Sequence, residues 1–590
     1  MINTQPKDRR ALLACAMGKI PADKCLSNVQ LVNVLTGEIY PCDVYVFDGF
    51  IAHVEIENCG KDINAKEIID CGGEYLIPGL IDAHIHIESS MLTPRHFAKG
   101  VVPHGTTTII TDPHEISNVF GEEAVHYMHD SSEDLPMRQL INIPSCVPAV
   151  PGLENSGAVF LVPEIERLAK LERVIGLAEV MDFIAVVNGE DRMMNIMDSA
   201  RENGLYLQGH APFISGRILS AYAIGGARTC HESRLPSEFR EKLRIGMSVD
   251  ARESSIAKNG KDSIEGIKGM KFLDNYCVCT DDREADDIIK DGHMNVVVNN
   301  LIEYGLDPIT AIKSATYNNA REAKIENLGA IAPGYIADMI LTKEITHIKP
   351  TKVFYKGELV AENGKLTAEI EEKSYPLESK NSMNIPDFDL ETFKFKAPIQ
   401  NGKVDVNVMT YPDHTLAMTT CEVESLNVVD GYIDISNDNN LKFIAILNRY
   451  GNGTIGYGIV RNFGTNFGAQ ASTISHDSHN LTIVYDNAEN ALIATKALVE
   501  SGGGMAMAYD NKLQATITLN VGGLMSTAPI EEVARQGEIM KTHLEKAGLD
   551  DMHNPLLRIV TLALPVIPNV KMSDMGLVDV NNKKIVPFFA

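Results

Sequence analysis

The sequence predicts an α/β protein built on a (β/α)8 barrel, with β-structure beside the barrel and an α/β domain after it. Three observations support this. Short apolar runs recur through residues 77–328, and several end at a His, Glu or Asp. Alternating apolar and polar segments flank that region on both sides. The chain has 590 residues, enough for two or three domains with sizeable cores.

The region before the barrel predicts a short helix followed by strands. Residues 1–26 hold an apolar patch that is too short to span a membrane and lacks a convincing cleavage site, so we expect an N-terminal helical extension. Residues 27–76 alternate apolar and polar side chains between turn signals at Thr36-Gly37 and Asp48-Gly49, which is typical of a meander of strands. Residues 329–368 repeat this pattern after the barrel.

The stretch from Pro78 to His86 is an apolar run that ends in two histidines one residue apart. Strand side chains alternate between faces, so His84 and His86 point the same way. Two imidazoles that point together from a strand end can hold one metal ion. An isolated His-x-His also fits two polar residues on a solvated strand face. The choice between these interpretations therefore depends on whether other potential metal ligands occur in the chain.

Four further apolar runs each lead to a potential metal ligand: Glu179, His210, His231 and Asp281. A (β/α)8 barrel uses roughly 30 residues per strand–helix unit. Counted from the histidine pair, that spacing places these residues near strands 4, 5, 6 and 8, at one mouth of one barrel. Each residue alone could be a structural polar group at a strand end. Together with the histidine pair, they predict a metal centre.

The charges of these side chains suit two divalent cations. Two cations a few ångströms apart repel each other, and an anionic ligand between them lowers that cost. Glu179 can contact both ions through its two carboxylate oxygens. A metal pair of this kind supplies a hydroxide nucleophile at neutral pH, so Glu179 and Asp281 are the candidate catalytic residues. The complete predicted ligand set is His84, His86, Glu179, His210, His231 and Asp281.

Several stretches carry a family resemblance: Pro78 to Met91, His104 to Thr108, Thr111 to Val119, Leu177 to Asp182, Gly209 to Pro212, Cys230 to Ser233, Cys279 to Arg283 and Gly468 to Asn480. Through them nearly the whole chain resembles the amidohydrolase superfamily and, within it, the bacterial adenine deaminases. The His-x-His segment is shared across the superfamily, whereas Asp112 to Glu115 and His476 to His479 point to the narrower family. The resemblance implies that residues 27–76 and 329–368 form one small discontinuous β-sandwich beside the barrel.

The same resemblance implies hydrolytic deamination of adenine to hypoxanthine and ammonia, a purine salvage reaction. Asp281 would accept the proton of the attacking hydroxide and deliver it toward the leaving group, with Asp282 as the alternative. Manganese or ferrous iron is the implied metal, and zinc is the alternative. We also expect a small-molecule partner, adenine, and a homo-oligomer in the form of a dimer.

Three further groups are candidates for contacting the substrate or the metal ligands. Asp112, His114 and Glu115 follow the apolar run predicted as strand 2, and Glu88, Ser89 and Ser90 follow the histidine pair. For both groups, hydrogen bonds to the histidines are favoured over direct substrate contact. The tail contributes His476 and His479, for which proximity to the active site and local packing are equally compatible with the sequence.

Two other functions stay open. Glu179 stands where dihydroorotase-like and hydantoinase-like members carry a carbamylated lysine, which argues against those ring-opening amidases. N-acetylglucosamine-6-phosphate deacetylases also use a strand glutamate, so another binuclear amidohydrolase such as an N-acetyl sugar deacetylase is the alternative. A non-catalytic scaffold is less favoured because all six ligand positions are occupied. Small zinc deaminases are excluded because the chain has no Cys-x-x-Cys.

Composition limits the partners. A net charge of -26 and a pI near 5.1 repel phosphate backbones, so we expect no nucleic acid partner. No stretch is apolar enough to cross a bilayer, and the 10 cysteines form no framework, so we expect a cytoplasmic protein without a membrane partner. Residues 369–394 are typical of a linker, and residues 395–590 predict an independent α/β domain, with a helix over 490–500 and a strand over 514–519.

Overall fold

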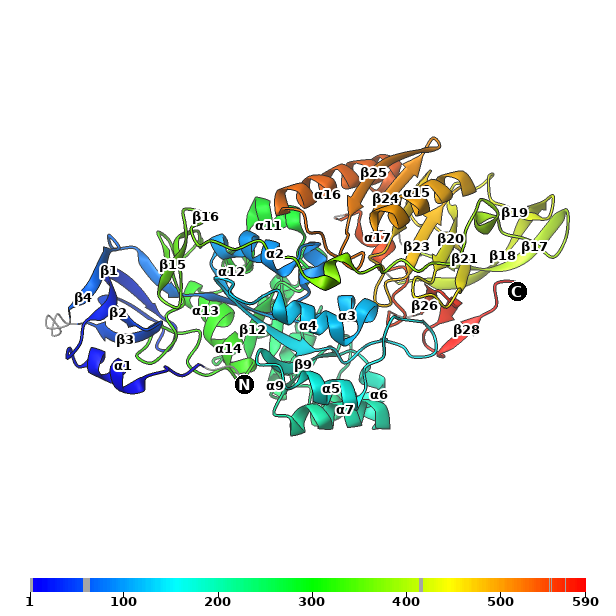
Figure 1. Ribbon diagram of the computed structural model, residues 1–590. Helices are drawn as coiled ribbons and strands as arrows, with labels where there is room; N and C mark the ends of the chain where they lie inside the picture. Colours follow the sequence, from blue (N-terminus) through cyan, green and yellow to red (C-terminus); the bar gives the residue numbers. More distant parts are fainter. Residues whose placement is uncertain (1–3, 57–63, 413–417, 551, 553, 568) are drawn as a thin grey trace.

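The computed structural model describes residues 4–56, 64–412, 418–550, 552, 554–567 and 569–590. Three parts follow one another along its length: an N-terminal sheet, a central barrel and a C-terminal domain (Figure 1). Among the described residues, no helix combines the length and the apolar character needed to cross a bilayer.

The N-terminal part is one nine-stranded sheet built from both sides of the barrel. β5 pairs antiparallel with β13, so the segments before and after the barrel meet as predicted. β1 begins at Ala22, inside the predicted helical extension, because Ala22 pairs with Ala65 on β4. The strands are β1 Ala22–Asn33, β2 Glu38–Phe47, β3 Phe50–Glu55, β4 Ala65–Asp70, β5 Tyr75–Pro78, β13 Met339–Thr342, β14 Pro350–Tyr355, β15 Glu358–Glu362 and β16 Lys365–Leu366, preceded by helix α1 Arg9–Ala16.

The barrel strands are parallel and buried on both faces, as expected for strands covered by helices. Five adjacent strands come first: β6 Leu80–Ile85, β7 Thr106–Thr111, β8 Arg138–Ile143, β9 Val174–Val180 and β10 Tyr206–Gly209. Residues 227–230 are described but form no regular strand, although the Cys230 carbonyl accepts from Asp250 N at 3.1 Å. β11 Val249–Arg252 and β12 Tyr276–Cys279 follow, and a bridge from Asp281 to Ile85 closes the ring.

Helices lie between these strands and after β12, most of them around the outside of the barrel (Figure 1). They are η1 Ile87–Ser90, α2 Pro94–Val101, η2 Val102–His104, α3 His114–Phe120, α4 Glu122–Asp130, α5 Val162–Leu168, α6 Phe183–Asn188, α7 Asp191–Glu202, α8 Gly216–Gly225, α9 Pro236–Arg244, α10 Gly260–Ile267, α11 Ala285–Asp291, α12 Met294–Glu303, α13 Pro308–Lys313, η3 Ser314–Asn318 and α14 Asn319–Glu322. Gly79, between β5 and β6, is required for close strand packing, because a Cβ there would overlap the Thr107 side chain on β7.

The C-terminal domain contains a second nine-stranded sheet with helices against it. Its predicted helix lies within α15, and its predicted strand coincides with β25 to within two residues. The strands are β17 Gly402–Thr410, β18 Thr420–Val429, β19 Tyr432–Asp434, β20 Leu441–Leu447, β21 Ile455–Arg461, β22 Ala469–Ser472, β23 Leu481–Tyr485, β24 Gly504–Tyr509 and β25 Lys512–Thr518. The other elements are η4 Pro376–Ser379, η5 Glu391–Phe393, α15 Ala488–Ser501, α16 Ile530–Leu544, η6 Glu545–Leu549, α17 Leu557–Val560, β26 Val570–Ser573, β27 Gly576–Asp579 and β28 Lys584–Val586.

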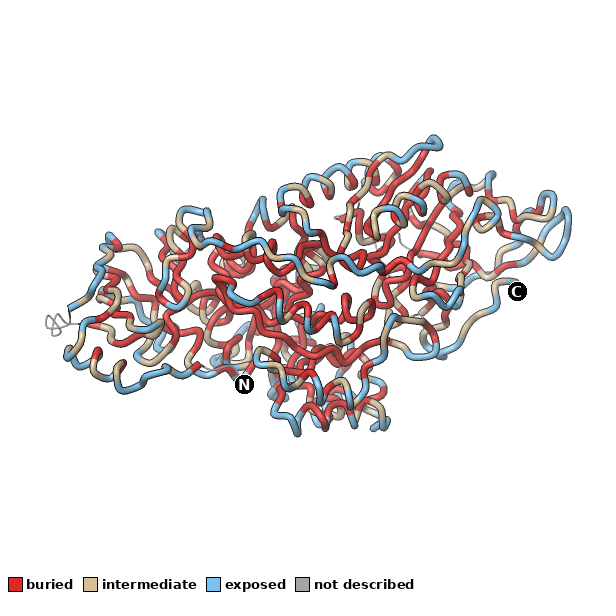
Figure 2. Tube along the Cα trace, viewed as in Figure 1, coloured by how far each residue is buried: buried red, intermediate tan, exposed pale blue. Residues whose placement is uncertain are grey.

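The C-terminal domain is not independent of the barrel, which corrects the prediction from sequence. One cluster of buried apolar side chains includes Leu92 and Ile116 of the barrel together with Leu524 and Met525 of the C-terminal domain. Figure 2 shows buried chain running from the barrel into this domain. The Ser526 amide also donates to the Met91 carbonyl at 2.8 Å. The mouth of the barrel is therefore covered by C-terminal residues.

Candidate metal centre and active site

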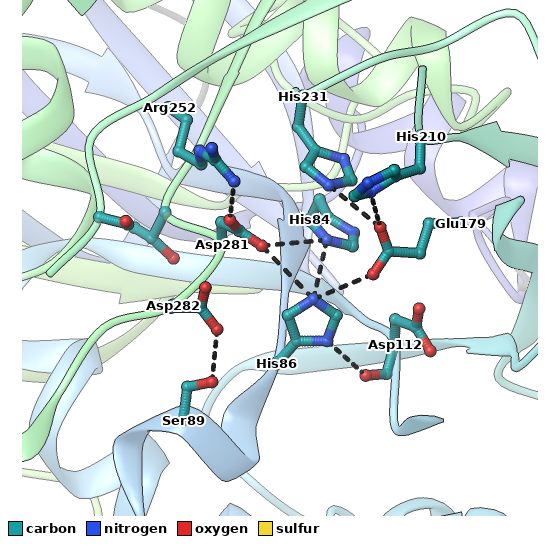
Figure 3. A network of polar contacts seen from close by, with 12 residues as sticks. His84, His86, Ser89, Asp112, Glu179, His210, His231, Arg252, Asp281 and Asp282 are labelled. Atoms are coloured by element: carbon teal, nitrogen blue, oxygen red, sulfur yellow. Dashed lines mark hydrogen bonds and ion pairs between the residues drawn. The ribbon is translucent and has the colours of Figure 1, made fainter. Parts of the chain in front are cut away.

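His84, near the end of the first barrel strand, and His86, just after that strand, present matching nitrogens to one point (Figure 3). Gln208 donates from Nε2 to the Ala83 carbonyl, so its Oε1 accepts from His84 Nδ1 at 2.9 Å. His86 Nδ1 donates to the Asp112 carbonyl at 3.0 Å. Both Nδ1 atoms therefore carry the proton, and both Nε2 lone pairs face the barrel mouth, 3.1 Å apart.

Glu179 lies near the end of β9, the fourth barrel strand, and uses both carboxylate oxygens (Figure 3). Its Oε1 lies 3.3 Å from His86 Nε2. Its Oε2 lies 2.5 Å from His210 Nδ1 and 3.1 Å from His231 Nε2. The two oxygens thus face different histidines, which is the arrangement that a carboxylate shared by two cations requires.

Asp281 follows β12 and completes the six predicted ligands. Its Oδ1 lies 3.3 Å from His84 Nε2 and 3.4 Å from His86 Nε2 (Figure 3). The backbone of Asp281 has a φ of 60°, and its amide donates to the His84 carbonyl. The structure therefore brings together side chains that are nearly 200 residues apart in the chain.

The donor set fits divalent cations. Nitrogen lone pairs and carboxylate oxygens converge with few protons between them. These electron-rich atoms repel one another unless a cation lies among them. Burial lowers the pKa of His86, but Asp281 and Glu179 outweigh burial and raise that pKa well above its ordinary value, so the site favours a cation. Two overlapping sets have all donors within 4.8 Å of one another: His84, His231 and Asp281, and Glu179, His210 and His231.

An arginine that sequence reasoning missed stands behind Asp281. Arg252 ends β11, the strand in the seventh barrel position, and its Nη1 donates to both Asp281 Oδ2 and Glu232 Oε1. Burial raises the pKa of Asp281, but Arg252 and the histidines hold it well below the usual range. Arg252 thus fixes one carboxylate oxygen of Asp281 and leaves Oδ1 facing the histidines. The sequence carries only a weaker signal, since the segment before Arg252, Ser248 to Ala251, alternates polar and apolar residues and is not an apolar run.

The predicted residues after strand 2 lie beside the metal ligands. Asp112 accepts through Oδ2 from His114 Nδ1 at 3.1 Å, and that Nδ1 lies 3.7 Å from Glu179 Oε1. Glu115 lies one residue further along α3, 3.4 Å from the Ser89 hydroxyl. Of the three, Asp112 contacts the histidine pair directly, because its backbone carbonyl accepts from His86 Nδ1.

The residues after the histidine pair divide into two groups. Ser89 Oγ donates to Asp282 Oδ1 at 2.5 Å, and Glu88 Oε1 accepts from the Ile116 amide at 3.2 Å, so both belong to the barrel mouth. Burial, followed by Glu115, raises the pKa of Glu88 to about 8. Ser90 donates to the Ile87 carbonyl within its own turn, so the structure does not bring it to the site.

The two tail histidines have different surroundings. His476 faces the barrel, with Nδ1 3.6 Å from Glu115 Oε1, and Asp477 beside it lies 3.7 Å from His114 Nε2. His479 is fully buried, has a φ of 53° and accepts through Nδ1 from the Ser475 amide. His476 therefore belongs to the site, whereas His479 packs locally.

Comparison with known proteins agrees with this geometry. Residues 75–360 match the amidohydrolase family, and residues 417–584 match the adenine deaminase C-terminal domain. An adenine deaminase of Desulforamulus reducens is 35% identical over 98% of this chain and 97% of its own length. Adenine deaminase 2 of Carboxydothermus hydrogenoformans is 36% identical over 98% of this chain and 99% of its own. These matches over nearly the full chain show that it belongs to the adenine deaminase family of the amidohydrolase superfamily.

Proposed function

We propose that the chain hydrolyses adenine to hypoxanthine and ammonia at the mouth of the barrel. One observation carries the proposal: imidazole and carboxylate groups from five separate parts of the chain converge on one buried point and suit two divalent cations. The full-length likeness to adenine deaminases supplies the substrate. The proposed ligands are His84, His86, Glu179, His210, His231 and Asp281.

Two bound divalent cations would supply a hydroxide nucleophile at neutral pH. In the reaction, the oxygen of one water molecule bonds to C6 of adenine, the C6–N6 bond breaks, and the protons of that water leave with ammonia or settle on the ring. The chain must therefore accept one proton near the nucleophile and deliver protons to a ring nitrogen and to the leaving amine.

Asp281 is placed to accept the first proton. Arg252 holds its Oδ2, so Oδ1 is the oxygen that faces the histidine pair. Its neighbour Asp282 is the alternative shuttle: burial and then Asp281 raise the pKa of Asp282 to about 6, which allows proton exchange near neutral pH. Glu88, with a pKa raised to about 8 by burial and Glu115, can hold a proton for a ring nitrogen.

We expect manganese or ferrous iron as the native metal, with zinc as the alternative, because imidazole with carboxylate suits all three. The dimeric homo-oligomer, the cytoplasmic location and the absence of nucleic acid and membrane partners likewise remain predictions from sequence.

An ammonia-release assay tests the proposed function. Metal-loaded enzyme should release one ammonia and one hypoxanthine per adenine consumed. Ammonia release from adenosine, cytosine and guanine is measured for comparison. Acetate release from N-acetyl sugars without ammonia from adenine would favour the deacetylase alternative. Neither product, from protein that carries two metal equivalents, would overturn the proposal.

A further inference from the structure

A cavity of about 30 Å³ lies between the barrel mouth and the C-terminal domain. That volume holds about two water molecules, so a purine would enter only as the lining side chains move apart. Both parts of the molecule contribute to it. Residues from the barrel include Ser89 and Asp282, and residues from the C-terminal domain include Ile474, His476, Met505 and Val560.

The cavity lies beside the candidate metal centre. Asp282, which lines it, follows the proposed ligand Asp281, and donor atoms of both residues and of His86 lie within 4.8 Å of one another. Ser89, on the same side, donates to Asp282 at 2.5 Å. A ring whose carbon is attacked at the metal centre would therefore extend toward this cavity.

The wall opposite the metal centre is largely apolar. Ile474, Met505, Leu557 and Val560 come from three separate elements or turns of the C-terminal domain and suit the flat face of a purine. His476 is the one ionisable side chain that this domain contributes to the lining. Burial lowers the pKa of His476, but Glu115 and Asp477 outweigh burial and raise it, so the ring suits donation of a hydrogen bond to an acceptor nitrogen of a purine.

The position of His476 is fixed while its ring stays available. Its backbone amide donates to the Val560 carbonyl at 3.1 Å. Its Nδ1 is 3.6 Å from Glu115 Oε1 and 3.5 Å from Asp477 Oδ1, at or beyond the usual limit for a hydrogen bond. The ring is 14% exposed, and it lines the cavity.

The C-terminal domain is held firmly over this cavity. Lys541 Nζ lies 2.6 Å from Glu284 Oε2, and Asn554 Nδ2 donates to Glu284 Oε1 at 2.5 Å. Glu284 itself lines the cavity on the barrel side. Charged and amide groups from the C-terminal domain thus close the rim of the pocket and keep its wall in place.

We propose that the C-terminal domain forms the outer wall of the purine pocket and that His476 is a specificity-determining residue, hydrogen-bonded to a ring nitrogen on the edge of adenine away from C6. This inference rests on the proposed function. It assigns to the C-terminal domain a direct part in substrate recognition.

Substitution of His476 tests the contact. His476→Leu keeps similar bulk but removes both hydrogen-bonding nitrogens, so the KM for adenine and the Kd for hypoxanthine should each rise about tenfold, as loss of one hydrogen bond predicts. The metal content should stay at the wild-type value, and kcat should fall less than kcat/KM. His476→Asn, which keeps a donor and an acceptor, should recover part of the affinity. His543→Leu is the matched control, because His543 pairs with Tyr509 away from the cavity.

A second variant tests the wall. Leu557→Ala trims a half-buried side chain of the lining, so turnover of 9-methyladenine relative to adenine should rise, since a methyl group on N9 points away from C6. Leu513→Ala, at an exposed position on β25, is its control. Unchanged KM and Kd in His476→Leu with wild-type metal content would overturn the inference. If that variant loses metal, an unchanged 9-methyladenine ratio in Leu557→Ala would overturn it. Wild-type enzyme that releases no ammonia from adenine would instead refute the proposed function.

Discussion

Replacing Arg252 with Met should destabilise the barrel and impair metal binding. Arg252 is buried and is shared by two buried carboxylates, Glu232 and Asp281. The substitution keeps an apolar stem of similar length and removes the guanidinium. Both carboxylates then lose a cationic partner in a place where water cannot replace it.

The size of the effect follows from Glu232. Burial raises the pKa of Glu232, but Arg252 and then His210 and His231 lower it, to about 2 from 4.5. That change corresponds to about 3 kcal/mol in favour of the charged form, similar to the cost of breaking a buried ion pair. Because the folded pKa lies below the unfolded one, the stabilisation is present above about pH 4.5 and is lost as the pH falls toward 2.

Thermal unfolding checks this estimate. For a domain the size of the barrel, about 3 kcal/mol corresponds to a Tm lower by roughly 6 to 12 °C at pH 8. In Arg252→Met, burial still raises the pKa of Glu232 and the largest opposing charge is gone, although His210 and His231 remain, so protonation of Glu232 at pH 5 should remove part of the deficit. Arg234→Met is the matched control, because Arg234 contacts the same Glu232 from an exposed position and should change the Tm by about 2 °C or less. An Arg252→Met protein with wild-type Tm and metal content would refute the reasoning.

Three further outcomes are expected. Glu179→Gln should weaken loading of at least one metal ion because it removes the shared negative charge; wild-type metal content in that variant, measured by atomic emission, would contradict the role of Glu179. Removing metal with a chelator should abolish ammonia release from adenine and Mn²⁺ should restore it, whereas recovery with Zn²⁺ alone would count against manganese or iron. Gly79→Ala should lower the Tm, since its Cβ would overlap Thr107. Gly537→Ala within α16, where an added Cβ meets no atom within 4 Å, should leave stability unchanged or raise it by up to about 1 kcal/mol; equal Tm values for the two variants would show that β6 and β7 can separate.

The convergence of the six proposed ligands could be predicted from sequence because each follows an apolar run and because barrel strands share one mouth. His84, Glu179 and Asp281 depend only on strand order and direction, which the chain spacing indicates. Arg252 ends β11 as well, but β11 contains Asp250 and is not an apolar run, so the same rule did not select Arg252.

The placement of the C-terminal domain could not be predicted in the same way. His476 reaches Glu115 across more than 300 residues of chain, and no local pattern specifies a contact of that range. His476 and His479 share one turn-like segment, yet only the fold shows that one faces the cavity and the other packs inside its own domain. The linker composition indicated a boundary between units but gave no information about the shared core.

The pairing of β5 with β13 has a consequence for biosynthesis. β5 leads through Gly79 directly into the strand that carries His84, yet its neighbour β13 leaves the ribosome about 260 residues later. The N-terminal strands therefore have an unpaired edge at β5 while all eight barrel units are translated. The barrel can attach to the completed N-terminal sheet only after Met339 has emerged. Nascent chains stalled before that point should be the aggregation-prone and protease-sensitive form of this enzyme.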